Sequence, residues 1–527
     1  MVKKDYSDYT KGELIKELHS LRKRKKYGLV WEQEKIPEFV VENCKKELPV
    51  LIEDIKKDVI TKNNISPNIL IEGDNYHALS ALNYTHSGKI DIIYIDPPYN
   101  TGAKTWRYNN AYVDTNDAFK HSKWISFMNK RLLLAKRLLS IKGFIICAID
   151  ANEIFPLGLL MDQIFGEKNR VGLVTVIHNP KGRNLSKFFS ENSEFMLIYA
   201  KNINSAEFND VVIDEDKKAT FNLSDNTGKY RLEPFMRVRT SWSKKNKPKN
   251  YYPIYVSKDL KSMCLEKKPN TIEVLPKTKD GREWAWKNIS PSFKKLNEEG
   301  KIIVQSESGN IQVFNKYYEK QVFKNVWTNK KYHSEFNGTN LLKKILGKNI
   351  FEYPKSLYLV QDILKITSKK KSVILDFFAG SGTTGQAVLE LNKEDGGNRK
   401  FILCTNNENK ICDDVCYPRI KKVIQNLQKE KTNNFIPSGL KYFKTTFVKS
   451  SPTDKNKKAL VNKSTEMLCI KEDTFKLIKK EAKYSIFTNG KKYTGIIYDD
   501  DSIPSFKKQV KQLDKKVSWG DYNKTKK

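Results

Sequence analysis

Four consecutive residues, Asp96-Pro97-Pro98-Tyr99, have the types and spacing best suited to chemistry, and they follow a predicted strand at 91–95. The two prolines remove two backbone donors and stiffen the exit from a predicted strand. We therefore expect the Asp96 carboxylate, the Pro97 carbonyl and the Tyr99 ring to be held in a fixed relation. Two such acceptors suit the exocyclic amino group of a nucleobase, on which an aromatic ring can stack. The alternative is an ordinary proline-rich turn.

A glycine-rich turn at 376–385 is the second candidate. Glycines 380, 382 and 385 satisfy G-x-G-x-x-G between a predicted strand at 373–375 and a predicted helix from 383. Side chains at these positions would keep a nucleotide away from the backbone amides. The motif alone is also compatible with a turn of purely structural purpose.

Three ligands are compatible with this turn. A P-loop needs Lys followed by Ser or Thr, but Gln386 and Ala387 follow Gly385. A dinucleotide site needs an acidic residue about 20 residues further on, and Glu408 comes late for that role. S-adenosylmethionine (AdoMet) carries an ammonium group, which the carboxylate of Asp376 could face. The turn by itself leaves these three interpretations open.

The elements that must position both candidates alternate between strand and helix. Short β-branched runs at 69–71, 90–95, 144–149 and 171–177 predict strands, with a helix at 123–140. After residue 340 the alternation resumes, with helices at 355–367, from 383 and at 417–430, and strands at 373–375 and 401–405. This order predicts an α/β fold with a doubly wound parallel sheet. The two candidates are expected to meet in one cleft.

The charge of the chain predicts a polyanionic partner. The 96 Lys and Arg residues exceed the 61 Asp and Glu residues, which gives a net charge of +35, and nucleic acid is the commonest polyanion. Between 205 and 340 the alternation is lost, and cations there are interleaved with aromatic residues. We expect DNA contacts from Arg231, Arg237, Arg239, Lys244, Lys245, Lys247 and Lys249, the alternative being a solvated basic loop.

The distribution of apolar residues and cysteines bears on membrane attachment, secretion and metal binding. The 527 residues contain no apolar stretch long enough to cross a membrane and begin with a polar segment rather than a signal peptide. The seven cysteines include no C-x-x-C pair, so we expect no metal site. These features predict a cytoplasmic protein without membrane attachment.

Together these motifs resemble the bacterial amino-methyltransferases of DNA in which the Asp-Pro-Pro-Tyr motif precedes the AdoMet turn (the beta class), and among them the modification (Mod) subunits of Type III restriction-modification systems. The resemblance covers about 65–450. It is carried by the segments 71–75, 96–102, 149–153, Phe351 with Pro354-Lys355, and 376–382. Two departures are visible: Ser356 stands where the family usually has proline, and Asn406-Asn407-Glu408 leaves the ribose contact unassigned.

The resemblance implies a circularly permuted, Rossmann-like AdoMet-dependent methyltransferase fold. Its implied parts are an N-terminal helical segment (1–60), the catalytic half (61–204), an inserted target-recognition domain (205–340), the AdoMet-binding half (341–437) and a C-terminal module (438–527). The implied catalytic residues are Asp96, Pro97, Pro98 and Tyr99. The implied cofactor residues are Asp74, Lys355, Asp376, Phe378, Gly380, Gly382 and Glu408.

The implied reaction is methyl transfer from AdoMet to adenine N6 in double-stranded DNA, with the base swung out of the duplex. The family also implies a homodimer, and any restriction activity would belong to a separate helicase-nuclease subunit. One alternative is N4-cytosine methylation, whose enzymes more often carry Ser at the position of Asp96. Another is a catalytically silent DNA-binding specificity subunit, which predicts loss of Asp96, Tyr99 or Gly380, and all three are present.

Overall fold

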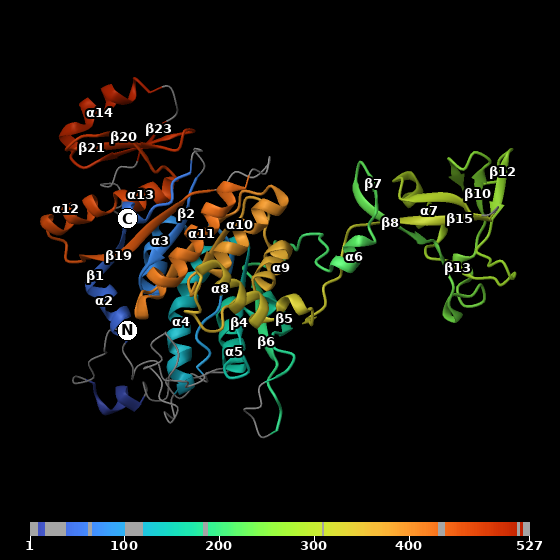
Figure 1. Cartoon of the computed structure of the whole chain (residues 1–527), viewed down its shortest axis with the longest axis horizontal. Helices are drawn as coiled ribbons and strands as arrows, with labels where there is room; N and C mark the ends of the chain where they lie inside the picture. Colours follow the sequence, from blue (N-terminus) through green and yellow to red (C-terminus); the bar gives the residue numbers. More distant parts are fainter. Residues whose placement is uncertain are drawn as a thin grey trace. The chain divides into compact units, whose positions relative to one another are not determined.

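The computed structural model describes residues 9–15, 38–61, 66–100, 120–182, 188–307, 310–430, 438–513 and 517–519. The chain divides into two compact units. Unit 1 comprises Met1–Asn209 and Lys324–Lys527, and unit 2 comprises Asp210–Phe323. Unit 2 is therefore an insertion in the sequence of unit 1, shown in green to yellow in Figure 1. It falls within the range 205–340 that the sequence assigned to target recognition.

Among the described residues, ten strands of unit 1 form one sheet in the order β1-β19-β2-β18-β17-β3-β4-β6-β5-β16. Their bounds are β1 Glu47–Glu53, β2 Asn68–Glu72, β3 Ile90–Ile95, β4 Leu139–Ile149, β5 Arg170–Ile177, β6 Ser193–Ala200, β16 Val326–Trp327, β17 Val373–Asp376, β18 Lys400–Thr405 and β19 Leu440–Lys449. The strands from β19 to β4 run parallel. β6 is antiparallel to both β4 and β5.

Helices cover this sheet because its central strands are apolar on both faces. In β3, Ile93 and Ile95 are buried in a cluster with α3, α4 and α5, whereas Ile92 and Tyr94 point to the other face and are buried as well. Strands buried on both faces are typical of parallel sheets with helices on each side. The bounds of the helices of unit 1 are α2 Phe39–Lys46, α3 Asn75–Thr85, α4 Lys120–Leu138, α5 Ile154–Phe165, α8 Leu341–Leu346, α9 Leu357–Thr367, α10 Thr383–Asp395, α11 Tyr417–Lys429, α12 Asp454–Lys463, α13 Thr465–Glu472 and α14 Ile503–Val510.

The predicted α/β fold with a large, mainly parallel central sheet is confirmed. The predicted elements recur closely: the helix expected at 355–367 is α9, and the strand expected at 401–405 is β18. Circular permutation stays a prediction. Within the described residues no helix is long and apolar enough to cross a membrane.

The ends of the chain differ from the sequence-based division. β1 lies in the predicted N-terminal helical segment and β19 in the predicted C-terminal module, yet they pair with each other, and β19 also pairs with β2. The main sheet therefore extends into both ranges, because the apolar residues of β1 and β19 add to its edge. A separate sheet follows, formed by β20 Lys476–Lys480, β21 Tyr484–Thr488, β22 Tyr493–Ile497 and β23 Val517–Trp519. Within the predicted N-terminal helical segment, residues 11–15 and α2 are helical, and residues 16–37 lie outside the described residues.

Unit 2 has its own apolar core, in which Phe235, Trp286 and Phe293 pack together. Its described strands form small antiparallel sheets. Their bounds are β7 Leu223–Asp225, β8 Gly228–Pro234, β9 Met236–Arg237, β10 Ile254–Ser257, β11 Met263–Cys264, β12 Thr271–Val274, β13 Ala285–Trp286, β14 Ile302–Glu307 and β15 Asn310–Tyr318, with helices α6 Glu215–Ala219 and α7 Ser290–Glu298.

Candidate active site

The segment Asp96–Tyr99, here called the acceptor corner, follows β3 directly. The indole N–H of Trp124 on α4 donates to the Pro98 carbonyl at 2.7 Å, which ties the corner to that helix. Asn100 has a φ of 55°, and its side-chain amide donates to Glu153 Oε1 at 2.5 Å. Anchors on both sides therefore fix the direction in which the chain leaves the strand. Residues 101–119, including the end of the family motif, lie outside the described residues.

The neighbour of β3 in the sheet is β17, which carries the glycine-rich turn. Ile374 and Leu375 pair in parallel with Ile92 and Ile93. Carboxyl ends of parallel strands meet at one edge of a sheet, where ligands of such folds bind. The acceptor corner and the glycine-rich turn therefore begin side by side, although they are far apart in sequence.

Lys355 lies at the centre of the contacts of the acceptor corner. Its ammonium group is 3.2 Å from Asp96 Oδ1 and donates to the Tyr99 hydroxyl. It also donates to Glu194 Oε2 at 2.7 Å, and the Tyr99 hydroxyl donates to the same oxygen at 3.3 Å. The side chains of Lys355 and Glu194 are 10% and 4% exposed, whereas that of Asp96 is 28% exposed. Asp96 is thus the carboxylate of this group that a ligand can reach.

Burial and neighbouring charges shift the pKa values of Asp96 and Glu194 in opposite directions. Burial raises the pKa of Asp96, against the pull of Lys355, and Glu194 raises it further. Burial alone would also raise the pKa of Glu194, but Lys355 and the neighbouring His178 overcome it and hold this pKa below its usual value. Burial would lower the pKa of Lys355, yet Asp96 and Glu194 together raise it. Glu194 and Lys355 therefore stay charged as a pair, and Asp96 is the group that can take up a proton.

The glycine-rich turn is held by hydrogen bonds to Asp376 at the end of β17. Its carboxylate accepts from the Phe378 N–H at 3.0 Å and from the Thr384 hydroxyl at 2.5 Å. Gly380 and Gly382 have φ values of 50° and 78°, in the region that favours glycine. Burial raises the pKa of Asp376 to about 7, against both hydrogen bonds, and Asp96 adds to the shift. A cation placed beside this carboxyl group would favour its charged form.

Two further residues support the turn from α10 and α11. A Cβ on Gly385 would lie 2.7 Å from Ile420 Cδ1 on α11, so the absence of a side chain lets the two helices approach. Arg419 is fully buried, and its guanidinium donates to Gln386 Oε1 and Thr383 Oγ1, both at 2.8 Å. It also donates to the Ser381 hydroxyl at 3.1 Å. The turn is therefore braced by a cation that sequence motifs did not indicate.

Asp74 lies at the start of α3, after β2. It accepts from the Tyr76 N–H at 2.7 Å and therefore caps the helix. The next residue, Asn75, donates to the Phe377 carbonyl at 3.1 Å, which joins this turn to the glycine-rich turn. Arg131 of α4 contacts both Asp74 and Asn75. The predicted cofactor residues Asp74, Asp376, Phe378, Gly380 and Gly382 thus belong to linked turns.

The end of β18, between β2 and β17, offers unmatched polar atoms. Thr405 Oγ1 and Asn406 Oδ1 are buried and have no hydrogen-bond partner among the described residues. Glu408 accepts from the Asn406 amide at 3.2 Å, and Asn407 donates to Glu72 Oε1 at 3.2 Å. This segment therefore holds acceptors for hydroxyl groups, and the role of Glu408 stays a prediction.

Comparison with known protein families identifies the family in which these motifs occur together. The family model described as DNA methylase (N6_N4_Mtase) matches residues 90–416, which include the acceptor corner and the glycine-rich turn. This chain belongs to the DNA methylase family. The expected resemblance to DNA amino-methyltransferases is confirmed.

Curated relatives of this family member include Mod subunits. The chain is 32% identical over 437 residues to the Type III restriction-modification enzyme EcoPI Mod subunit of Escherichia phage P1, which covers 75% of this chain and 66% of the relative. It is 32% identical over 360 residues to the Type II methyltransferase M.KpnI of Klebsiella pneumoniae, which covers 67% of this chain and 84% of the relative. It is 32% identical over 391 residues to the StyLTI Mod subunit of Salmonella typhimurium, covering 68% of this chain but only 55% of the relative. The chain thus spans between about half and two thirds of the Mod subunits it matches.

Comparison with solved structures matches this chain to the M1.HpyAVI–SAM complex. It matches with a TM-score of 0.32 and 13% identity, over 68% of this chain and 98% of that chain.

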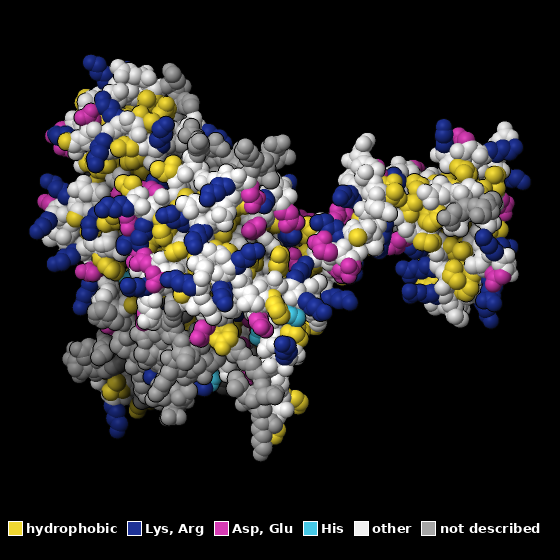
Figure 2. Space-filling model, viewed as in Figure 1, with side chains coloured by type: hydrophobic (Ala, Val, Ile, Leu, Met, Phe, Trp, Pro, Cys, Tyr) yellow, Lys and Arg dark blue, Asp and Glu magenta, His cyan; other side chains and the backbone are white. Residues whose placement is uncertain are grey.

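In unit 2, the predicted DNA-binding cations of this family member have different surroundings. Arg231 donates to Glu233 at 2.6 Å, and Lys244 donates to Glu283 at 2.9 Å. Arg237 lies 4.6 Å from the centre of the Trp242 ring. Figure 2 shows Lys and Arg side chains on the surface of this unit. The predicted residues Arg237, Arg239, Lys245, Lys247 and Lys249 are all exposed.

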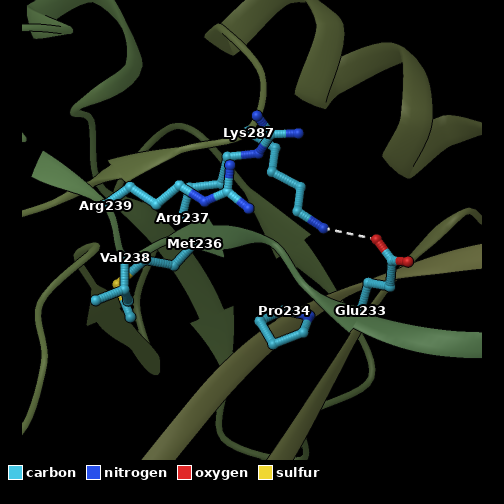
Figure 3. A pocket seen from close by; sticks show the side chains of 7 residues that line it. All are labelled: Glu233, Pro234, Met236, Arg237, Val238, Arg239 and Lys287. Atoms are coloured by element: carbon cyan, nitrogen blue, oxygen red, sulfur yellow. Dashed lines mark hydrogen bonds and ion pairs between the residues drawn. The ribbon is translucent and has the colours of Figure 1, made fainter. Parts of the chain in front are cut away.

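A hollow of about 290 Å³ in unit 2 is lined by some of these cationic side chains. Figure 3 shows Arg237 and Arg239 above a Glu233–Lys287 ion pair of 2.9 Å, with Pro234, Met236 and Val238 completing the lining. Glu233 also binds Arg231, so its two oxygens each meet a cation. The hollow therefore presents mainly donors.

Sequence reasoning missed three supporting residues of the site: Glu194, Trp124 and Arg419. Glu194 had a usable signal, since it is an isolated acid at the start of an otherwise apolar run at 194–200. Such a carboxylate needs a partner when it is buried. The other two had none, because a Trp or an Arg within an amphipathic helix is unremarkable before the helix is placed.

Proposed function

We propose that this protein is an AdoMet-dependent DNA methyltransferase that transfers a methyl group to adenine N6 in duplex DNA. The observation that carries the proposal is the adjacency of β3 and β17, which brings the acceptor corner and the glycine-rich turn together in a member of the DNA methylase family. The reaction needs both a polar contact for an amino group and a site for a cationic cofactor. These two requirements are met at neighbouring strand ends.

The residues of the glycine-rich turn fit AdoMet. When bound, AdoMet supplies a methyl group on a positively charged sulfur. Asp376, whose pKa is about 7, would face the ammonium group, and the glycines at 380 and 382 leave the backbone accessible. The buried acceptors of Thr405 and Asn406 would receive the ribose hydroxyls.

The acceptor corner would bind the target base. Asp96 and the Pro97 carbonyl accept hydrogen bonds from the amino group, and this favours the positive charge that grows on nitrogen during attack. The Tyr99 ring stacks on the extruded base. After the methyl group has moved, Asp96 can take the surplus proton from nitrogen, because burial raises its pKa. Adenine is favoured over cytosine because Asp, rather than Ser, occupies position 96.

The biological setting is part of the same proposal. Similarity to the EcoPI and StyLTI Mod subunits supports a modification subunit of a Type III restriction-modification system. A separate restriction subunit and a homodimer would follow from that assignment. Duplex DNA is the proposed partner, with the cations of unit 2 as its contacts.

The test is to sequence DNA, with detection of modified bases, from cells that express the protein or its Asp96→Ala variant. We expect N6-methyladenine at one recurring motif with the unsubstituted protein and a loss of at least about 100-fold with the variant, comparable to removal of one transition-state contact. Equal methylation by both proteins would refute the role of Asp96. Methylation at cytosine N4 would show that cytosine, not adenine, is the target. DNA without modification would refute the proposed methyltransferase activity.

A further inference from the structure

Glu194 links the acceptor corner, which follows β3, to β6, two strands away in the sheet. It lies near the start of β6, where it pairs with Val176 of β5 and precedes Phe195, the partner of Ile149 on β4. Only 3% of the residue is exposed. A carboxylate inside a sheet is costly unless it is paired, and the described partners of Glu194 Oε2 are Lys355 and Tyr99.

The ammonium group of Lys355 lies between two carboxylates. It is 2.7 Å from Glu194 Oε2 and 3.2 Å from Asp96 Oδ1, so the contact with Glu194 is the closer one. If Glu194 were neutral, the cation would have one carboxylate left and would bind Asp96 more tightly. Asp96 would then be occupied by Lys355 and would lose strength as an acceptor for a substrate amino group.

We propose that Glu194 is a positioning residue that holds Lys355 away from Asp96 and orients Tyr99 for the methyl transfer. This inference rests on the proposed function. It also moves Lys355 from the cofactor, where the family resemblance places it, to the base-binding side, since the described contacts of its ammonium group all go to Asp96, Tyr99 and Glu194. A pair kept only for stability could be replaced by apolar residues at little cost, and would not need to touch the corner.

The charge of Glu194 should also be visible in the pH dependence of the reaction. Among the described residues, the charged and titratable groups that face Asp96 are Lys355, Glu194, Tyr99, Tyr94, Cys147 and Asp376. Glu194 raises the pKa of Asp96. Removing its charge therefore lowers that pKa, and the acid limb of the rate profile moves to lower pH.

The test compares Glu194→Gln with the matched control Glu191→Gln, since Glu191 lies three residues earlier and is exposed. Single-turnover methylation of duplex DNA is measured from pH 5.5 to 8.5 with saturating AdoMet. We expect E194Q to react at least tenfold more slowly than the unsubstituted protein, with an AdoMet Kd within twofold of it and an acid limb at lower pH. E191Q should match the unsubstituted protein in all three measurements.

Three results would overturn the proposal. One is an E194Q rate equal to that of E191Q, and another is a slower rate with an unmoved acid limb. The third is an AdoMet Kd raised more than tenfold in Lys355→Met, which would return Lys355 to the cofactor. If E194Q does not fold, Tyr99→Phe tests the same link, and an unchanged single-turnover rate would refute it. Absence of methylation by the unsubstituted protein would instead refute the proposed function.

Discussion

The binding of AdoMet should depend on pH through Asp376. Burial raises the pKa of this carboxyl group to about 7, although Phe378 and Thr384 donate hydrogen bonds to it. The ammonium group of the ligand favours the charged carboxylate, so protonation competes with binding. Affinity should therefore rise with pH up to the pKa and level off above it.

The size of the effect follows from that value. With a pKa of about 7, about nine tenths of the Asp376 carboxyl groups are protonated at pH 6.0 and about a quarter at pH 7.5. The Kd should be roughly eightfold larger at pH 6.0, equivalent to about 1.2 kcal/mol. The comparison stops at pH 7.5 because α-amino groups lose their own proton at about 7.7 to 8.0.

Isothermal titration calorimetry between pH 5.5 and 7.5 measures this dependence directly. Asp376→Asn should bind more weakly and with no midpoint near 7. Thr384→Val removes a hydrogen bond that lowers the pKa of Asp376, so its midpoint should move to higher pH. A Kd that is constant over this range in the unsubstituted protein, or an unshifted midpoint in T384V, would refute the reasoning.

Three other outcomes are expected. Arg419→Met should lower the free energy of unfolding in urea by about 2 to 4 kcal/mol, because hydrogen bonds to a charged group are lost while its burial cost is relieved; an unchanged midpoint would contradict this. Gly385→Ala should cost about 1 to 3 kcal/mol in the same assay, because its Cβ would lie 2.7 Å from a methyl group of α11, and wild-type stability would disprove the close approach. The double variant Arg237→Ala/Arg239→Ala should lower the slope of log binding constant against log salt concentration by the amount expected for the loss of about two phosphate contacts. Arg282→Ala, already paired with Asp280 at 3.1 Å, serves as control, and equal slopes for all three proteins would exclude the hollow of unit 2 as a DNA contact.

Local sequence predicted the two motifs because each is continuous in the chain. The acceptor corner directly follows β3, and the glycine-rich turn lies between β17 and α10 as expected. Proline, glycine and strand-forming residues act over a few positions, so their effects can be recognised without a structure.

Contacts between distant segments could not be predicted in that way. The position of Glu194 beside Lys355 depends on β6 entering the sheet antiparallel between β4 and β5. Periodicity predicts a strand but not its place or direction. The same limit explains β1 and β19, which were assigned to terminal segments although they pair at the edge of the main sheet.

The insertion of unit 2 as one continuous stretch, Asp210–Phe323, has an evolutionary consequence. This stretch has its own apolar core, and its described residues contribute no strand to the ten-stranded sheet. A single recombination event that exchanges it would bring in a new set of surface cations and leave both the acceptor corner and the glycine-rich turn intact. Under the proposed function, in which the cations of unit 2 contact DNA, such an exchange would change the recognised sequence without new selection on the chemistry.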